Sequence, residues 1–167
     1  MKNKLFLFFL LISNTVFALT FQLSEKNHLI NLGDYTLYTD DVYDRIQVTD
    51  LVDVEWQLNP AGGNFGIAKY NKWIKFDFNN STNNTLNRFL FFPYNLVDEI
   101  DVYQKSSDEI VLLKQIGTVR NPLLNDKVSR GWAVELEFPK GNSTIYIKVS
   151  HLYKSLRVNS FIVEEKN

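Results

Sequence analysis

The 167-residue chain contains no cysteine. It therefore cannot form a disulfide, and it lacks the lipid-modified cysteine of a lipoprotein. Histidine is nearly absent as well, because His28 and His151 are the only two and lie far apart. Neither has a ligand-spaced companion, so a metal site of the usual histidine or cysteine type is not expected. We expect His28 to be exposed to solvent and His151 to pack or cap at a strand end.

Motifs for chemistry are missing too. The sequence contains no G-x-S-x-G nucleophile elbow and no Gly-rich phosphate loop or dinucleotide fingerprint. The glycines of residues 62–66 follow a segment that is not a strand, which excludes a nucleotide loop there. A net charge of −1 argues against nucleic-acid binding, since phosphate recognition needs a basic surface. We expect a non-catalytic protein without a cofactor.

Long apolar runs are limited to the N-terminus. Two lysines precede the run Leu5 to Ile12, and Val16-Phe17-Ala18 supplies the small-x-small pattern of a signal peptidase site. Residues 1–18 are therefore predicted to be a signal peptide that is cleaved after Ala18. The alternative is a membrane anchor, but the run is too short to span a bilayer well and no stop-transfer charges follow. Export without cysteine favours the bacterial periplasm, with no transmembrane segment left after cleavage.

The rest of the sequence indicates β-structure. Aromatic residues make up 14% of the chain, mainly 13 Phe and 8 Tyr, and these residue types favour strands. In the stretch 64–79, Ile74, Phe76 and Phe78 alternate strictly with Trp73 and polar residues, which is the period of a half-buried strand. Trp73 is unusual because it shares a face with charged residues.

Similar patterns separated by turn residues predict about eight strands. The further predicted strands are 35–39, 86–92, 99–104, 109–116, 132–138, 145–149 and 156–163. The strand at 86–92 is apolar on both faces and is expected to be buried on both. Residues 47–58 fit neither period, and they predict a short helix or an irregular crossing segment that Thr49 and Asp50 can cap. We expect an extended lead-in at 19–32 and an all-β antiparallel sandwich of jelly-roll type at 33–167.

Several short motifs occur in a fixed order. They are Asn64-Phe65-Gly66, Trp73-Ile74-Lys75-Phe76, Pro93, Val97-Asp98-Glu99-Ile100-Asp101-Val102-Tyr103, Gly117, Arg130 and Tyr146-Ile147-Lys148-Val149. In this order and spacing the sequence resembles the type 2 extracellular sensory domain of 7TMR-DISM receptors, which are bacterial seven-transmembrane receptors with diverse intracellular signalling modules. The resemblance covers residues 33–163.

The resemblance implies a periplasmic jelly-roll domain, similar to carbohydrate-binding modules, that senses a small ligand such as a sugar. In the family this domain precedes a seven-helix membrane domain and then a histidine kinase or a diguanylate cyclase. The sequence ends after the sensory domain. We therefore expect a free-standing binding protein, a partner of a separate receptor, kinase or cyclase, or the remnant of a truncated receptor gene.

Outward-facing aromatic residues form the candidate binding site. Flat rings stack on sugars, and charged side chains bind their hydroxyls. The predicted ligand-binding residues are Trp73, Lys75, Tyr103, Arg130, Tyr146 and Arg157. Arg130 matches a recurring arginine of the family and can hold a carboxylate or pair with an acidic neighbour. The alternative is packing, with Trp73 buried under the loop 59–66, and we favour it for Trp73 because the motif is shared across a family with varied ligands.

Two groups of carboxylates suggest weaker alternatives. Glu135 and Glu137 share a strand face about 7 Å apart, a separation that an acid/base pair can use, although a solvated strand face is the favoured interpretation. Asp40, Asp41 and Asp44 lack the spacing of a calcium loop. Two functions remain: a sensory domain that binds a glycan or another small polar ligand, and an interaction module that docks on a membrane receptor. A concave polar groove beside the aromatic residues would favour the first, and a flat apolar patch the second.

Overall fold

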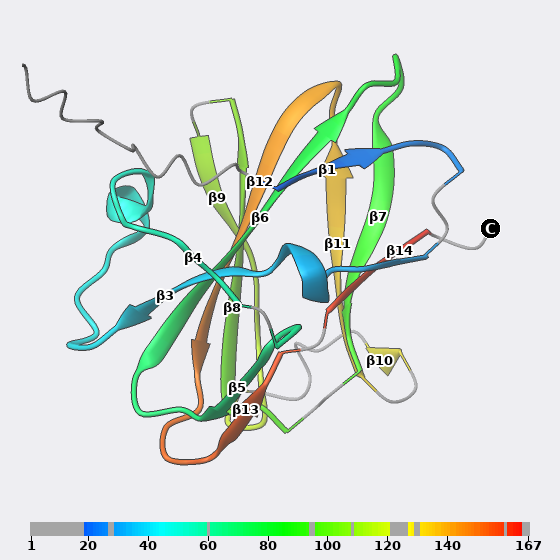
Figure 1. The fold of residues 1–167 in the computed structure, drawn as a ribbon. Helices are drawn as coiled ribbons and strands as arrows, with labels where there is room; N and C mark the ends of the chain where they lie inside the picture. Colours follow the sequence, from blue (N-terminus) through cyan, green and yellow to red (C-terminus); the bar gives the residue numbers. More distant parts are fainter. Residues whose placement is uncertain are drawn as a thin grey trace, which may run out of the picture.

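A computed structural model describes residues 19–26, 29–59, 61–93, 96–107, 109–120, 127–128, 131–158 and 160–164. In this part of the chain, helical structure is limited to two short 3-10 turns, and the other regular elements are strands (Figure 1). The elements are β1 (Thr20–Leu23), β2 (Leu29–Asn31), η1 (Gly33–Tyr35), β3 (Leu37–Asp41), η2 (Val48–Val52), β4 (Gln57–Leu58), β5 (Asn64–Ile67), β6 (Asn71–Asn80), β7 (Leu86–Phe92), β8 (Glu99–Ser106), β9 (Glu109–Ile116), β10 (Lys127–Val128), β11 (Gly131–Phe138), β12 (Gly141–Ser150), β13 (Ser155–Arg157) and β14 (Phe161–Glu164).

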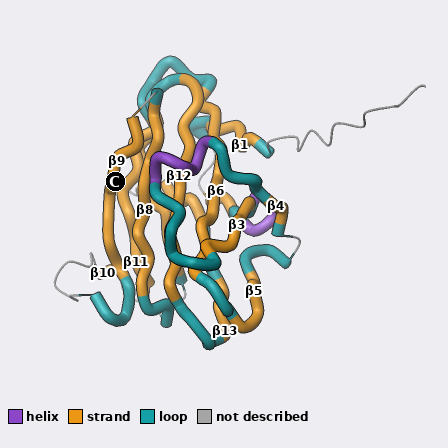
Figure 2. Tube along the Cα trace, turned by 90° about the vertical axis from the view of Figure 1, so that its left-hand side faces the viewer, coloured by secondary structure: helices purple, strands orange, loops and turns teal. Residues whose placement is uncertain are grey.

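These strands form two sheets that pack face to face (Figures 1 and 2). Sheet I has the order β4-β3-β6-β12-β8-β9, with β1 added beside β6. Sheet II has the order β10-β11-β7-β14-β2, and β5 pairs with β13 in a separate ribbon. The β1–β6 pairing is parallel, and the other described pairings are antiparallel. The predicted antiparallel β-sandwich of jelly-roll type is confirmed.

The core lies between the two sheets, and alternating strands supply it. Ile74, Phe76 and Phe78 on β6 are 0%, 1% and 1% exposed. The matching inward residues on β12 and β11 are Ile145, Ile147, Val149, Trp132, Val134, Leu136 and Phe138, and all are buried. Burial of one large apolar side chain contributes roughly 1.5–3 kcal/mol, so these faces account for much of the folding free energy. The inward faces predicted from period-two alternation are confirmed.

The ends of the chain differ from the sequence-based expectation. Residues 19–32 contribute a strand to each sheet, because β1 pairs with β6 and β2 pairs with β14. The strand predicted at 35–39 begins at Leu37, after a 3-10 turn in which Tyr35 N donates to Leu32 O at 3.0 Å. The predicted strand 156–163 is divided into β13 and β14, which pair with β5 and β7. Strands as short as these are too brief for alternation to reveal, which explains why the prediction gave fewer.

Strand β7 corrects one prediction about burial. Its Arg88, Leu90 and Phe92 are buried, but Phe89 and Phe91 on the other face are only half-buried. The strand is central, between β11 and β14. The expectation of burial on both faces was wrong, because sheet II contacts sheet I through one face only and the described part of the chain does not cover the other face fully.

Residues 42–56, called the cap below, cross the outer face of sheet I (Figure 2). Their central turn is η2, which confirms the predicted short helix or crossing segment. The turn is capped by Gln47 and Asp50: the Asp50 backbone N–H donates to Gln47 O at 3.0 Å, and the Asp50 side chain accepts from Gln47 N at 2.9 Å. Thr49 does not cap the turn, since its hydroxyl donates to the Asp50 carboxylate.

Several predicted features lie outside the described residues. They are the signal peptide 1–18 with its cleavage site, His28 and Arg130. Within the described ranges, no helix has the length and apolar character needed to cross a bilayer.

Candidate functional site

The cap builds a second, smaller hydrophobic cluster on the outer face of sheet I. Its buried members are Leu51 of the cap, Trp73 of β6 and Tyr146 of β12, packed against the partly buried Ile46, Val48, Val54, Trp56, Tyr103 and Ile110. The strand register explains why sheet residues distant in sequence meet here: Tyr146 lies directly opposite Lys75 on β6 and Tyr103 on β8. The predicted aromatic face therefore exists, but the cap covers most of it.

Trp73 lies beneath this cap and is 2% exposed. Its ring packs against Tyr103 with a centroid distance of 5.6 Å, and its indole N–H donates to Asp41 Oδ2 at 3.4 Å. The cover is the cap and not the loop 59–66 that we expected. No face of this ring is open to a ligand, so Trp73 serves packing in this conformation.

Asp41 fixes the start of the cap. Its other carboxylate oxygen, Oδ1, accepts hydrogen bonds from the backbone N–H groups of Arg45 at 2.8 Å and Ile46 at 3.3 Å. One buried carboxylate thus joins the turn at the head of the cap to the Trp73 indole. Because an unpaired buried carboxylate is costly, these three donors explain how Asp41 is tolerated at 3% exposure.

A hollow of about 390 Å³, called the cap hollow, opens where the cap leaves sheet I. It is lined by Leu51, Val52, Trp56, Lys75, Lys105, Ser107, Asn142, Thr144 and Tyr146. One wall is aromatic, since Trp56 stacks on Tyr146 with ring centroids 5.9 Å apart and planes inclined by 30°. The rest of the lining includes two ammonium groups, an amide and two hydroxyls.

The charges around the cap hollow are arranged around Asp77. Lys75 Nζ lies 2.9 Å from Asp77 Oδ2 and 5.8 Å from the centroid of the Trp56 ring. Thr144 donates its hydroxyl to Asp77 Oδ1 at 2.7 Å. Burial, and then the charge of Asp77, raise the pKa of the Tyr146 phenol, which keeps it protonated and neutral at physiological pH. Lys105 has no ion pair with a described residue, so its charge is available to a bound molecule.

The six predicted site residues are only partly brought together. Trp73, Lys75, Tyr103 and Tyr146 meet under or beside the cap, and of these Lys75 and Tyr146 line the hollow. Arg157 lies on β13, in a different hollow, and Arg130 is outside the described residues. Sequence reasoning missed Trp56, Lys105, Asn142 and Thr144. Trp56 gave a signal, since it is an aromatic residue in a segment that fits neither period.

The aspartates considered for calcium have other partners. Asp40 binds Lys72, Asp41 binds the head of the cap, and Asp44 Oδ1 accepts from Lys148 Nζ at 2.6 Å. Among the described residues, no group of three or more acidic or histidine side chains is placed to hold a metal ion. Calcium binding by these aspartates therefore has no support in the geometry.

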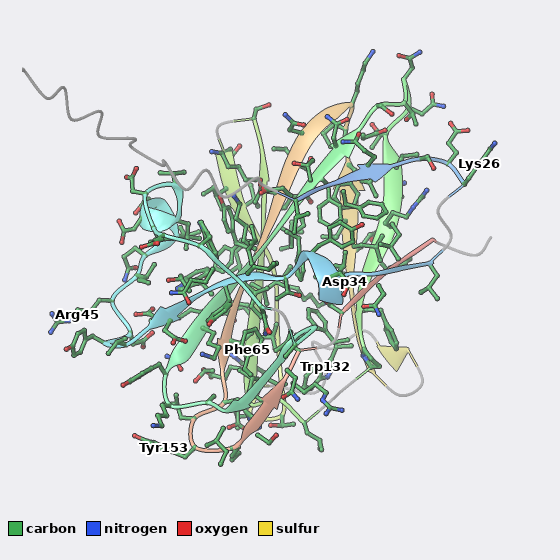
Figure 3. The ribbon with its side chains drawn as sticks, viewed as in Figure 1. Lys26, Asp34, Arg45, Phe65, Trp132 and Tyr153 are labelled. Carbon is green, nitrogen blue, oxygen red and sulfur yellow. The ribbon has the colours of Figure 1, made fainter. Side chains whose placement is uncertain are left out.

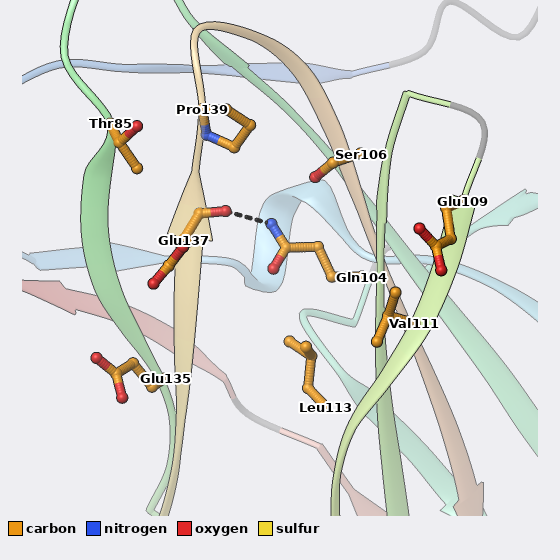
Figure 4. Close-up of a pocket in the computed structure, with 9 residues that line it drawn as sticks. All are labelled: Thr85, Gln104, Ser106, Glu109, Val111, Leu113, Glu135, Glu137 and Pro139. Atoms are coloured by element: carbon orange, nitrogen blue, oxygen red, sulfur yellow. Dashed lines mark hydrogen bonds between the residues drawn. The ribbon is translucent and has the colours of Figure 1, made fainter.

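The two glutamates considered for hydrolysis line a third hollow, of about 500 Å³, between β9 and β11 (Figure 4). Glu135 and Glu137 are both exposed on β11, and Glu109 faces them from β9. Gln104 donates to the backbone oxygen of Glu137 at 2.6 Å, but neither the Glu135 nor the Glu137 carboxylate binds a described residue. Without a group to orient them, these carboxylates fit a solvated strand face better than an acid/base pair.

Comparison with known proteins gives three results. No curated protein matches the chain. The solved structure of a family 35 carbohydrate binding module from Clostridium thermocellum is similar at 8% sequence identity and a TM-score of 0.40, over 82% of this chain and 98% of that chain. The family model described as 7TMR-DISM extracellular 2 matches residues 33–159, about three quarters of the sequence. The protein therefore belongs to the 7TMR-DISM extracellular 2 family.

Proposed function

We propose that this protein is a non-catalytic, exported sensory domain that binds a small polar ligand, such as a carbohydrate, in the cap hollow. One observation carries the proposal: polar groups from three strands and the β8–β9 turn converge on a concave site beside an aromatic wall. This is the arrangement that distinguishes a binding groove from a flat packing face. The family assignment supports the periplasm as its compartment.

The lining favours a ligand rich in hydroxyl groups. Lys75 and Lys105 donate to hydroxyl or carbonyl oxygens, and Asn142 both donates and accepts. Trp56 and Tyr146 offer apolar ring surface for the C–H groups of a sugar. A purely apolar ligand would cover the Lys105 ammonium group, which has no ion pair with a described residue, and burial of an unpaired charge is costly.

Ligand binding in the cap hollow also provides a mechanism for signalling, through the position of the cap. The hollow is lined by the cap residues Leu51, Val52 and Trp56 on one side and by sheet I on the other. A bound molecule therefore contacts both parts and stabilises the closed arrangement over any arrangement in which the cap moves away. A separate membrane receptor, kinase or cyclase that reads the cap surface would then detect the ligand.

The test is a ligand screen by thermal shift, followed by calorimetry. The panel contains glucose, galactose, N-acetylglucosamine, cellobiose and their uronic acids. A ligand at one hundred times its Kd adds about 2.7 kcal/mol to the unfolding free energy, which corresponds to roughly 5–10 °C in Tm. Lys105→Met should weaken the affinity for that ligand at least tenfold. Lys69→Met changes a lysine outside the hollow and should leave the affinity unchanged. Binding that is unaffected by Lys105→Met would overturn this site.

A second candidate, docking on a membrane receptor, rests on a different surface. Ile67 at the end of β5, Tyr70 in the loop that follows, and Leu152 and Tyr153 in the loop between β12 and β13 are exposed apolar side chains. A hydrogen bond joins these two loops, since Tyr153 N donates to Ala68 O at 2.7 Å. If no compound raises the Tm while the protein co-purifies with a membrane receptor, and Tyr153→Ser abolishes that co-purification, docking replaces ligand binding as the function.

A further inference from the structure

Sheet I extends one strand further than sheet II at the edge formed by β9. In sheet I, β9 is the last strand and pairs with β8. In sheet II, β11 lies across from β8, since Gln104 of β8 donates its amide N–H to the backbone oxygen of Glu137 at 2.6 Å. The hollow of about 500 Å³ that Glu109, Glu135 and Glu137 help to line lies beside β11 and against β9 (Figure 4). We call it the β9–β11 hollow.

The edge of β11 beside this hollow lacks a partner strand over most of its length. Among the described strands, β10 covers it, but only at the first two residues of β11, the second of which is Trp132 (Figure 3). The backbone oxygen of Glu137 points towards Gln104 and away from β7 (Figure 4). Because backbone groups alternate between the two edges of a strand, those of Glu135 point the same way. From residue 133 onward, the described chain therefore leaves this edge without a strand.

Gln104 takes part of the place of the missing strand. Its side chain is 8% exposed and lines the hollow. The hydrogen bond from its Nε2 to Glu137 O fixes the orientation of the amide, so Oε1 is the atom left for another partner. Among the described residues, this oxygen has no donor. A largely buried acceptor without a donor is unfavourable, and the backbone N–H of an added strand would satisfy it.

The inner face of β9 supplies an apolar wall. Val111 lies directly opposite Gln104 in the β8–β9 register, so both side chains are on the side of sheet I that faces sheet II. Val111 is 44% exposed, and Leu113 is only partly buried. Both line the hollow together with Pro139. In a sandwich the facing sheet normally covers such residues, and a strand added beside β11 would bury them.

The charged groups of the hollow are all acidic. Glu109, Glu135 and Glu137 are exposed, and their carboxylates have no partner among the described residues. No lysine, arginine or histidine is found among the described residues of the lining. Glu135 and Glu137 point to the outer face of sheet II, since they alternate with the buried Leu136 and Phe138. A lysine or arginine opposite them on an added strand would share that face and form favourable cross-strand pairs.

We propose that the β9–β11 hollow binds an extended segment of a partner protein, which adds a strand to the free edge of β11. The segment alternates basic and apolar residues: the basic ones pair with Glu135 and Glu137, and the apolar ones pack on Val111 and Leu113. A second copy of this chain fits less well, because two paired β11 edges would bring like charges together. The hollow shares no lining residue with the cap hollow, so this site is independent of the function proposed above.

The test is an NMR titration of the full protein with a six-residue peptide in which lysine and valine alternate, blocked at both ends. The backbone amide signals of Glu135 and Glu137 should shift saturably. The charge-reversed peptide, with glutamate in place of lysine, should not bind. A third peptide has the lysine–valine sequence with methylated backbone nitrogens. It keeps the charges but cannot donate the hydrogen bonds of a strand, so it should bind at least tenfold more weakly.

Variants separate the two faces of the added strand. The double variant Glu135→Gln, Glu137→Gln should weaken the affinity for the lysine–valine peptide at least tenfold, and Val111→Ser should also weaken it. The matched control is Asp53→Asn, Glu55→Gln, which removes two exposed carboxylates of the cap and should leave the affinity unchanged. All five side chains are exposed, so these substitutions are not expected to unfold the domain, and melting curves check this.

Three results of the titration would overturn the proposal. The first is the absence of a saturable shift at Glu135 and Glu137. The second is equal affinity for the methylated peptide, which would mean that charge alone attracts it. The third is an unchanged affinity in the double glutamate variant. If the protein alone sedimented as a dimer with the β11 amides protected from hydrogen exchange, a second copy would occupy this edge instead.

Discussion

Lys148 on β12 lies 2.6 Å from Asp44 in the cap, an ion pair between positions 104 residues apart. Asp44 has a left-handed backbone with a φ of 52°, which aspartate tolerates better than most residues. The same ammonium lies 5.6 Å from the centroid of the Trp73 ring. This one pair therefore fastens the head of the cap to the sheet directly above the aromatic cluster, where a loosened cap would expose Trp73.

Acid should loosen the cap. The hydrogen bond from Lys148, and then that from Asn71, lower the pKa of Asp44 below its ordinary value of 3.8. A lowered folded-state pKa means that the pair stabilises the fold above pH 3.8 and that this stabilisation is lost as the pH falls through the folded-state pKa. The Asp44 side chain is 60% exposed, so the pair contributes less than about 1 kcal/mol.

The indole N–H signals of the three tryptophans can follow this change by NMR. Trp56 and Trp73 lie in the cap cluster, and Trp132 lies between the sheets and serves as the internal control. As the pH falls below 3.8, the first two signals should move while that of Trp132 stays. Asp44→Asn should remove most of the movement. A movement of the same size in Asp44→Asn would mean that another carboxylate holds the cap.

Truncation of Trp73 should destabilise the whole domain. Trp73→Ala removes a side chain that is 2% exposed and joins the cap, β6 and Tyr103, so a loss of about 3–5 kcal/mol is expected in urea denaturation. Trp73→Phe keeps part of the packing and should cost less, although it removes the donor to Asp41. A loss of unfolding free energy below 1 kcal/mol for Trp73→Ala would show that the cap does not cover the Trp73 ring when the protein is in solution.

Gly117 should tolerate alanine much less well than Gly141. Both have a positive φ, +139° and +103°, but only at Gly117 would a Cβ meet backbone atoms; at Gly141 nothing lies within 4 Å. Gly141→Ala should therefore cost about 1–2 kcal/mol from backbone strain alone. Gly117→Ala should cost clearly more, because Asp98 must move, and it should also disturb the ring signals of His151, whose Nδ1 lies 3.3 Å from Asp98 N. If the two variants lost the same free energy of unfolding, close contact with the Asp98 backbone would not be the reason for glycine at position 117.

The sequence predicts the sandwich well because its central strands are long and half-buried. On β6, β8, β11 and β12 apolar residues alternate over most of the strand, and the inward faces that this predicts are buried between the sheets. Short strands such as β4 and β13 contain two or three residues, and only their partners define them. Their existence depends on tertiary contacts that no local pattern encodes.

The site was harder to predict because the cap covers the outer aromatic face of sheet I. Alternation correctly places Trp73 and Tyr146 on the outer face of sheet I, but it contains no information on the cap that covers them. The cap fits neither period because its apolar residues pack on the outside of a sheet from an irregular path. The sequence therefore assigns Trp56 to no sheet face. Similarly, Arg157 was grouped with Lys75 by charge, and only the pairing of β13 with β5 separates them.

Alkaline pH should also act through the cap cluster. Burial, and then the charge of Asp77, raise the pKa of Tyr146, so the folded protein keeps this phenol protonated at a pH where the unfolded chain has released its proton. The folded state binds more protons in that range, and the free energy of unfolding must therefore fall as the pH rises above about 10. Tyr146→Phe removes this titration, and its stability, measured in urea at several pH values, should fall less steeply than that of the unmodified protein. Tyr43→Phe, which changes an exposed ring outside the cluster, is the matched control and should follow the unmodified protein. If Tyr146→Phe and Tyr43→Phe gave the same slope, Tyr146 would have to reach solvent freely, and the closed cap would not be the state that dominates in solution.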